Sequence, residues 1–137
     1  MLPRFFLVLG HQTRGQMLPA WPGGGRQNRP AAVDGEWVAW RLLGSNHREL
    51  ARSALVFPDA AAAGQGVALV QSAVDRATAG VETLRGRWAW QLSIDGAAVA
   101  VSSRLYQRSR DCSDSLATAL GALTIAEFRD TFPRLRR

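Results

Sequence analysis

A β-hairpin is predicted for residues 86–106 of this 137-residue chain, and it restricts the possible folds more than any other stretch. Apolar residues alternate along both arms, which is typical of strands with one buried face. Between the arms, Asp95 and Gly96 form a dipeptide that accepts the positive φ angles of a tight primed turn. The alternating apolar positions are Trp88, Trp90, Leu92, Val99 and Val101.

The same pattern occurs earlier in the chain, because residues 37–57 repeat it with one extra residue in the turn. Each copy reads strand, turn, strand, aromatic residue and helix, which indicates an internal duplication. A chance match among common apolar residues is the competing explanation. The aligned pairs are Val38 with Trp88, Trp40 with Trp90, Leu42 with Leu92, Ser53 with Ser102, Phe57 with Tyr106, Ala63 with Cys112, Val67 with Leu116, Val70 with Ala119 and Val74 with Leu123.

The duplication predicts an α+β fold, because a single copy is at the limit of what can bury a core alone. We expect two ββα-like repeats, about 34–78 and 79–123, related by a pseudo-twofold axis within a single domain. Their strands are expected to form one joint antiparallel sheet, with one helix per repeat on the same face. The helices are expected at about 59–77, where Asp59 can cap the first turn, and at about 109–122.

Two further segments are expected at the ends of this domain. Residues 1–33 are rich in Pro and Gly and predict a flexible arm, disordered or loosely docked. Its apolar run at 3–9 is compatible with an extra strand or with an anchor for a partner. Residues 124–137 predict a short amphipathic helix with a basic tail, because Thr124 and Glu127 have the spacing of a capping box. Its apolar face holds Ile125, Phe128 and Phe132.

The formal charge of +6 comes from the ends of the chain, because acidic and basic residues between 34 and 123 balance. All basic residues are Arg, which in a chain rich in Ala, Gly and Val indicates a composition bias rather than phosphate recognition. No apolar run is long enough to span a bilayer. The single cysteine cannot form an intramolecular disulfide, so a cytoplasmic location is the simpler expectation.

No residue pattern of an enzyme is found, and we expect no catalytic residues, no cofactor and no metal. The two histidines, His11 and His47, have no partner at ligand spacing and are expected in solvated loops. Cys112 aligns with Ala63, which predicts a buried thiol with a structural role. The serines at the end of the return strand lack a histidine that could act as general base.

The tryptophans have two possible roles, core packing or a stacking platform for single-stranded nucleic acid. Trp40, Trp88 and Trp90 share the parity of their apolar neighbours and are expected to face the helices. Trp37 has the parity of Arg41 and is expected on the open face, as a possible contact residue. The side chains that could line a shallow anion-binding patch, as an alternative to solvated strand and helix ends, are Arg52, Arg104, Arg108 and Arg110.

These patterns also carry a family resemblance. Residues 88–92 read Trp-x-Trp-x-Leu, and residues 99–103 read Val-Ala-x-Ser-Ser. An aromatic residue at 106 then precedes a helix with a small residue at 112 and apolar ones at 116 and 123. Over roughly residues 35–123 this arrangement resembles the YegP-like tandem-repeat domains.

The resemblance implies a small α+β fold of paired ββα-like units, found as tandem or dimeric repeats. It implies no established activity, cofactor or catalytic residues. The chain departs from the family at the turn Asn46-His47, where the usual dipeptide is Asn-Gly, and it has no evident opening strand before Gly35.

Three functional hypotheses follow. The first is a non-enzymatic module that contacts a protein partner or a second copy of itself, using Trp37 and the apolar face of residues 124–137. The second is nucleic-acid binding through the Arg-bearing ends, which predicts strong salt dependence. The third is small-ligand binding between the repeats. The arginines of the second hypothesis are Arg14, Arg26, Arg29, Arg134, Arg136 and Arg137.

Overall fold

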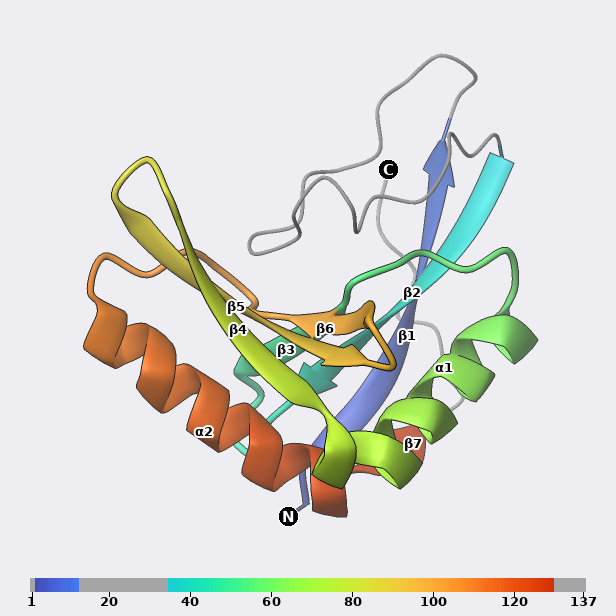
Figure 1. The fold of residues 1–137 in the computed structure, drawn as a ribbon. Coiled ribbons are helices and arrows are strands. Elements are labelled where there is room, and N and C mark those ends of the chain that lie inside the picture. The colour runs from blue at the N-terminus through green and yellow to red at the C-terminus, as the bar shows by residue number, and fades with distance from the viewer. Residues whose placement is uncertain (1, 13–34, 130–137) are drawn as a thin grey trace.

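A seven-stranded sheet with two helices on one face forms the protein in a computed structural model, which describes residues 2–12 and 35–129 (Figure 1). Along the chain, three strands precede each helix, and the strand order across the sheet is β4-β5-β6-β3-β2-β1-β7. The elements are β1 (Arg4–Gln12), β2 (Gly35–Leu43), β3 (Glu49–Ser53), α1 (Ala60–Ala73), β4 (Thr78–Leu84), β5 (Arg87–Ile94), β6 (Ala97–Val101), α2 (Ser109–Ile125) and β7 (Glu127–Arg129), with a 3-10 turn η2 (Val74–Arg76) after α1.

The predicted α+β class is confirmed, and the sheet is larger than predicted. Each half contributes three antiparallel strands rather than two, β1-β2-β3 and β4-β5-β6, and the halves join where β3 pairs with β6. The sheet is mixed rather than wholly antiparallel, because β7 runs parallel to β1. Helix α2 packs on β5 and β3, whereas α1 packs on β2, β1 and β6, so each helix touches strands of both halves.

Local signals placed several elements correctly. Asp95 and Gly96 form the predicted tight turn between β5 and β6, with φ angles of 53° and 83°. The Asp59 side chain accepts a hydrogen bond of 2.8 Å from the Ala62 amide and caps α1 as predicted. A second tight turn with positive φ, at Arg85 and Gly86, joins β4 to β5.

The prediction for residues 1–33 is wrong in its N-terminal part. Strand β1 lies inside the sheet between β2 and β7, so this stretch is neither disordered nor loosely docked. Phe5 and Leu7 are fully buried, because every second residue of the apolar run faces the helices. Of the two interpretations of this run, the extra strand is therefore the correct one. Residues 13–34 lie outside the described part of the chain.

The predicted helix beginning at Thr124 is also wrong. Helix α2 continues through Ile125, and β7 follows directly as a short strand whose Glu127 amide donates to the Pro3 carbonyl at 2.9 Å. Gln71 of α1 donates from Nε2 to the carbonyls of Leu123 and Ala126, at 3.2 and 2.8 Å, and so satisfies acceptors that the end of α2 leaves open. Tertiary pairing therefore overrides the local capping-box pattern.

The core lies between the sheet and the two helices. Trp40 and Trp90 are fully buried on the helix-facing side, and Trp88 is partly buried against the same cluster, so their predicted orientation is confirmed. Cys112 is buried as predicted, and this burial raises the pKa of its thiol. His47 is exposed in the β2–β3 turn, as expected, whereas His11 lies in strand β1 and not in a loop. Among the described residues, no helix is long and apolar enough to cross a membrane.

Candidate ligand-binding site

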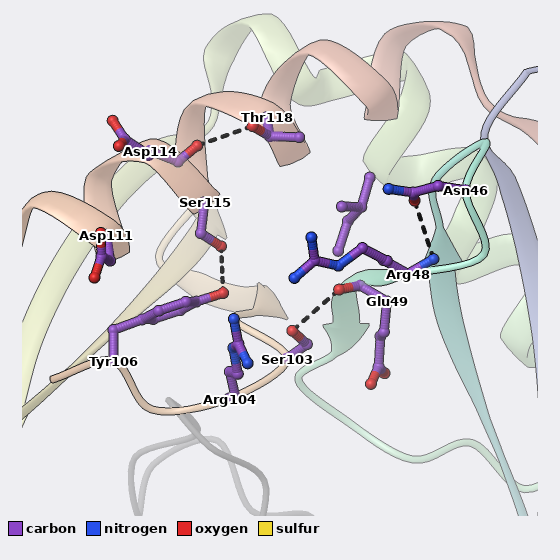
Figure 2. Close-up of a pocket in the computed structure, with 11 residues that line it drawn as sticks. Asn46, Arg48, Glu49, Ser103, Arg104, Tyr106, Asp111, Asp114, Ser115 and Thr118 are labelled. Atoms are coloured by element: carbon purple, nitrogen blue, oxygen red, sulfur yellow. Dashed lines mark hydrogen bonds between the residues drawn. The ribbon is translucent and has the colours of Figure 1, made fainter.

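A polar hollow of about 730 Å³ lies where the two halves meet, between the β2–β3 turn, the segment that joins β6 to α2, and the exposed side of α2 (Figure 2). Its size is in the range of small-molecule sites. The lining residues are Asn46, Arg48, Glu49, Leu50, Ser103, Arg104, Tyr106, Asp111, Asp114, Ser115 and Thr118.

Backbone hydrogen bonds hold the segment after β6 in place. The amide of Trp90 donates to Ser102 Oγ at 3.4 Å, and this hydroxyl donates to the Arg104 carbonyl at 3.0 Å. Trp88 and Tyr106 exchange two backbone hydrogen bonds of 2.6 and 2.7 Å. The segment is therefore bound to β5 at both ends, and this fixes the side chains of Arg104 and Tyr106 at the hollow.

A pair of hydroxyl groups forms the floor of the hollow. The Tyr106 hydroxyl donates to Ser115 Oγ at 2.8 Å, and Trp90 Nε1 donates to the same oxygen at 3.0 Å. The indole nitrogen can only donate, and the two hydroxyls share one of their two protons between them. One hydroxyl proton is thus left over to donate into the hollow.

Two guanidinium groups converge on this hydroxyl pair. Arg104 stacks over the Tyr106 ring, with its guanidinium carbon 5.2 Å from the ring centre. Arg48 reaches the hollow from the β2–β3 turn, where its amide donates to Asn46 Oδ1 at 3.1 Å. Figure 2 shows both guanidinium groups directed into the hollow on the side of Tyr106 and Ser115.

The carboxylate of Glu49 does not neutralise these two arginines. Its oxygens accept two hydrogen bonds from Arg41, at 2.9 and 3.1 Å, and two from Arg52, at 2.7 and 3.0 Å. Burial alone would raise the pKa of Glu49, but the hydrogen bonds and positive charges of Arg52 and Arg41 outweigh it, and the pKa is lowered. In Figure 2 this carboxylate points away from α2, towards the opposite side of the sheet.

The acidic side chains of α2 lie at the rim. Asp111 accepts a hydrogen bond of 3.1 Å from Arg108, so one of its carboxylate oxygens already has a partner. Asp114 is exposed, and Figure 2 shows its carboxylate turned outward from the guanidinium groups. Ser103 Oγ donates to the Glu49 carbonyl at 3.2 Å and ties the two halves together at the base of the hollow. Half-buried Asp111 and the exposed side chains of Asp114, Arg48 and Arg104 therefore all line the hollow, and its donors gather on the side of Tyr106 and Ser115.

The predicted contact residues are not part of this hollow. Trp37 lies on the face turned away from the helices, as predicted, but it is only 4% exposed and fills the space that a Cβ at Gly10 would need, so it offers no contact surface. Ile125 and Phe128 are 55% and 40% exposed, at the junction of α2 and β7. The remaining predicted contacts fall outside the described residues; they are Phe132, Arg14, Arg26, Arg29, Arg134, Arg136 and Arg137.

The predicted Arg patch is divided among different roles. Arg104 lines the hollow, whereas Arg52 is engaged by Glu49 and Arg108 by Asp111. Sequence reasoning missed Arg48, Tyr106 and Ser115 because it looked for matches between the aligned halves. The signal was in the mismatches, where a polar residue of one half aligns with an apolar residue or a glycine of the other. Within residues 2–12 and 35–129, no group of three or more His, Cys, Asp or Glu side chains is arranged to hold a metal ion.

This geometry defines an α+β protein with a polar hollow at the junction of two three-stranded halves. The solution NMR structure of YegP from E. coli, a protein of unknown function, is similar to it, with a TM-score of 0.63. The similarity covers 100% of this chain and 97% of that chain at 14% sequence identity, so it shows a YegP-like fold and nothing of the chemistry. No protein-family model and no curated protein matches the sequence.

Proposed function

We propose that the protein is a non-enzymatic tandem-repeat module in which the polar hollow between the two repeats is a small-ligand binding site. Three kinds of observation support this proposal. They are the matching backbone contacts of the two halves, the register at the junction of the halves, and the change in residue type around the hollow.

The first support is a set of hydrogen bonds that recur at aligned positions. The Trp40 amide donates to Ser53 Oγ at 3.2 Å, as the Trp90 amide does to Ser102 Oγ at 3.4 Å. The two serines then donate to carbonyls two residues further on, at 2.8 and 3.0 Å. The backbone bridge between Val38 and Phe57 likewise matches the one between Trp88 and Tyr106. Chance similarity of apolar residues does not account for repeated buried polar contacts.

The second support is the register of the sheet. At the junction, Arg52 of β3 pairs with Val101 of β6, which is its own aligned residue, as a twofold relation between the halves requires. A register shift also falls at the same point in each half, after Leu42 in the first and after Leu92 in the second. We infer from this register a pseudo-twofold axis between β3 and β6.

The third support, which carries the functional proposal, is the divergence between the halves. Phe57 packs on Gly66, where a Cβ would lie 2.7 Å from the ring, whereas the aligned Tyr106 donates a hydrogen bond to Ser115. Other residues that line the hollow are polar where their aligned partners are apolar. Arg48 aligns with Ala97, Ser103 with Ala54, Arg104 with Leu55 and Thr118 with Leu69. Polar residues gathered at this hollow, where the aligned positions of the other copy are apolar or lack a side chain, indicate a ligand rather than a structural need of the repeat.

A thermal-shift screen tests this function. The full chain is heated with a fragment set of organic acids, phosphates, amines and polyols, in parallel with a Tyr106→Phe, Ser115→Gly double variant that copies the first half. We expect at least one compound to raise the melting temperature of the natural chain and not that of the variant, because a ligand stabilises only the state that binds it. Stabilisation of neither protein, or of both equally, would refute a ligand site at the hollow.

A second candidate function is self-association through Ile125 and Phe128. Both side chains are large, apolar and well exposed; Ile125 ends α2, and Phe128 lies in β7, which is an edge strand of the sheet. An Ile125→Ser, Phe128→Ser double variant should then sediment as a smaller species than the natural chain. Identical sedimentation of the two proteins counts against it. Nucleic-acid binding through the Arg-bearing ends and a cytoplasmic location remain predictions of the sequence.

A further inference from the structure

We propose that the ligand of the hollow is a small organic or inorganic anion whose carboxylate or phosphate group sits between Arg48 and Arg104 and accepts the spare hydroxyl proton of the Tyr106–Ser115 pair. This inference rests on the proposed function and specifies the chemistry of the same site. It is carried by the hydrogen-bonding character of the hollow, the pairing of its charges, and the rigidity of its donors.

The groups that point into the hollow are donors. A guanidinium group has five N–H donors and no acceptor, and the hydroxyl pair has one proton to give once Trp90 Nε1 and the internal hydrogen bond are satisfied. Arg48, Arg104 and this hydroxyl pair all line the hollow. A ligand that matches them must present several acceptors close together, which is what a carboxylate or a phosphate does.

The charges lead to the same conclusion. Within the described part of the chain, Arg41 and Arg52 pair with Glu49, Arg76 with Asp95, and Arg108 with Asp111. Arg48 and Arg104 form no ion pair there. Two unpaired cations that line one hollow repel each other, and a bound anion removes this repulsion. Glu49 cannot take this role, because its carboxylate is held by two other arginines and faces away.

Contacts within the protein already position Arg104 at the hollow. Its guanidinium carbon lies 5.2 Å from the centre of the Tyr106 ring, and its carbonyl accepts a hydrogen bond of 3.0 Å from Ser102 Oγ. A planar group that is already oriented loses less conformational entropy when it forms paired hydrogen bonds with an anion. The Tyr106 side chain contacts Arg104 through its ring and Ser115 through its hydroxyl, so the cation and the hydroxyl pair lie next to each other.

Isothermal titration calorimetry of the full chain tests the anion. The probes are citrate for carboxylates, inorganic phosphate for phosphates, and glucose as a neutral compound rich in hydroxyl groups. We expect citrate, phosphate or both to bind and glucose not to bind. Arg104→Leu, which copies the aligned Leu55, should weaken anion binding about tenfold or more, the usual effect of losing a hydrogen bond to a charged group. Arg48→Ala should weaken it similarly.

The matched control is Arg76→Ala, which removes the same charge from an exposed ion pair at the end of α1. It should leave the affinity within about twofold, because an exposed pair contributes little and acts only through screened charge. Arg104→Lys keeps the charge and loses the planar fork, so it should bind with intermediate affinity. A melting curve for each variant confirms that it is folded.

Three outcomes would overturn the anion assignment. The first is absence of heat with citrate and with phosphate, and the second is equal loss of affinity in Arg76→Ala and Arg104→Leu, which would indicate a net-charge effect. The third is binding of glucose that Arg104→Leu does not change; this would leave a ligand site at the hollow and reject only its anionic character. Selective binding of citrate or of phosphate identifies which anion class the site prefers.

Discussion

The Tyr106 hydroxyl lies 2.8 Å from Ser115 Oγ. These two residues align with Phe57 and Gly66, where the Phe57 ring packs against the α1 backbone at a position that has no side chain. Both pairs hold the segment after a hairpin against the following helix. One does so by close packing and the other by a hydrogen bond that leaves polar atoms at the surface. The pair Tyr106–Ser115 is therefore the local difference that makes room for a polar hollow in the second half.

Tyr106→Phe should separate the structural role of this pair from its binding role. Loss of the hydroxyl removes one hydrogen bond to Ser115 and should lower the free energy of unfolding by about 0.5–1.5 kcal/mol. Ser115 keeps the proton that the hydroxyl pair offers to the hollow, because Tyr106 is the donor within the pair, so citrate or phosphate should bind about as tightly as to the natural chain. Chemical denaturation and calorimetry on the same variant measure the two effects. A tenfold or larger loss of affinity would contradict the assignment of the donated proton to Ser115.

Two helical glycines should respond in opposite ways to substitution by Ala. A Cβ at Gly66 would lie 2.7 Å from the Phe57 ring, so Gly66→Ala should destabilise the protein by about 1 kcal/mol or more. At Gly121 of α2 nothing lies within 4 Å of the added Cβ, and Gly121→Ala should stabilise it by about 0.5–1 kcal/mol through helix propensity. Urea unfolding checks both. Stabilisation by Gly66→Ala would show that Phe57 moves aside freely.

Glu49 should make stability depend on pH in the acidic range. Its pKa is lowered from 4.5 in the folded protein, so the unfolded chain binds a proton first as the pH falls. The stabilisation is therefore complete above about pH 4.5 and is lost as the pH falls through the lower folded pKa. Glu49→Gln should remove this dependence and cost about 1–2 kcal/mol at pH 7, because Arg41 and Arg52 pair across neighbouring strands and lose their shared carboxylate.

Glu82→Gln, on the exposed strand β4, is the control for this experiment. Urea unfolding between pH 3 and pH 7 should give parallel curves for the Glu82→Gln variant and the natural chain, and a flatter curve for Glu49→Gln. Parallel curves for all three proteins would contradict the role assigned to Glu49.

The place of β1 in the sheet can be tested at two positions that each lie opposite one of the aligned tryptophans, Trp40 or Trp90. Leu7 lies opposite Trp40 and is fully buried, so Leu7→Ala should cost about 2–5 kcal/mol. Val81 of edge strand β4 lies opposite Trp90 and is 47% exposed, so Val81→Ala should lower the free energy of unfolding by much less than Leu7→Ala does. Differential scanning calorimetry ranks the two variants. Equal small losses would mean that β1 is not an integral strand.

Local sequence signals were sufficient for the elements formed by neighbours in the chain. Asp95-Gly96 specified a tight turn, Asp59 specified a helix start, and alternation placed Trp40 and Trp90 in the core. These features depend on interactions over a few residues or on a regular period, which a single sequence displays directly.

Long-range pairing was not predictable in the same way. Strand β1 pairs with β2 across residues 13–34, and the short strand β7 replaces a helix favoured by the local capping-box pattern because it pairs with β1. The hollow has the same origin. Arg48 and Arg104 line the same hollow only because β3 pairs with β6, and no spacing along the chain predicts that arrangement.

The most direct test of the central claim is an NMR titration of the full, isotope-labelled chain with citrate, followed through its backbone amides. The account predicts that the amide signals of Ser103, Arg104, Tyr106 and Ser115 move as citrate is added. The signals of the aligned residues Ala54, Leu55, Phe57 and Gly66 should stay in place. Equal movement of both sets, or no movement at the hollow, would contradict the claim that the anion binds at the hollow.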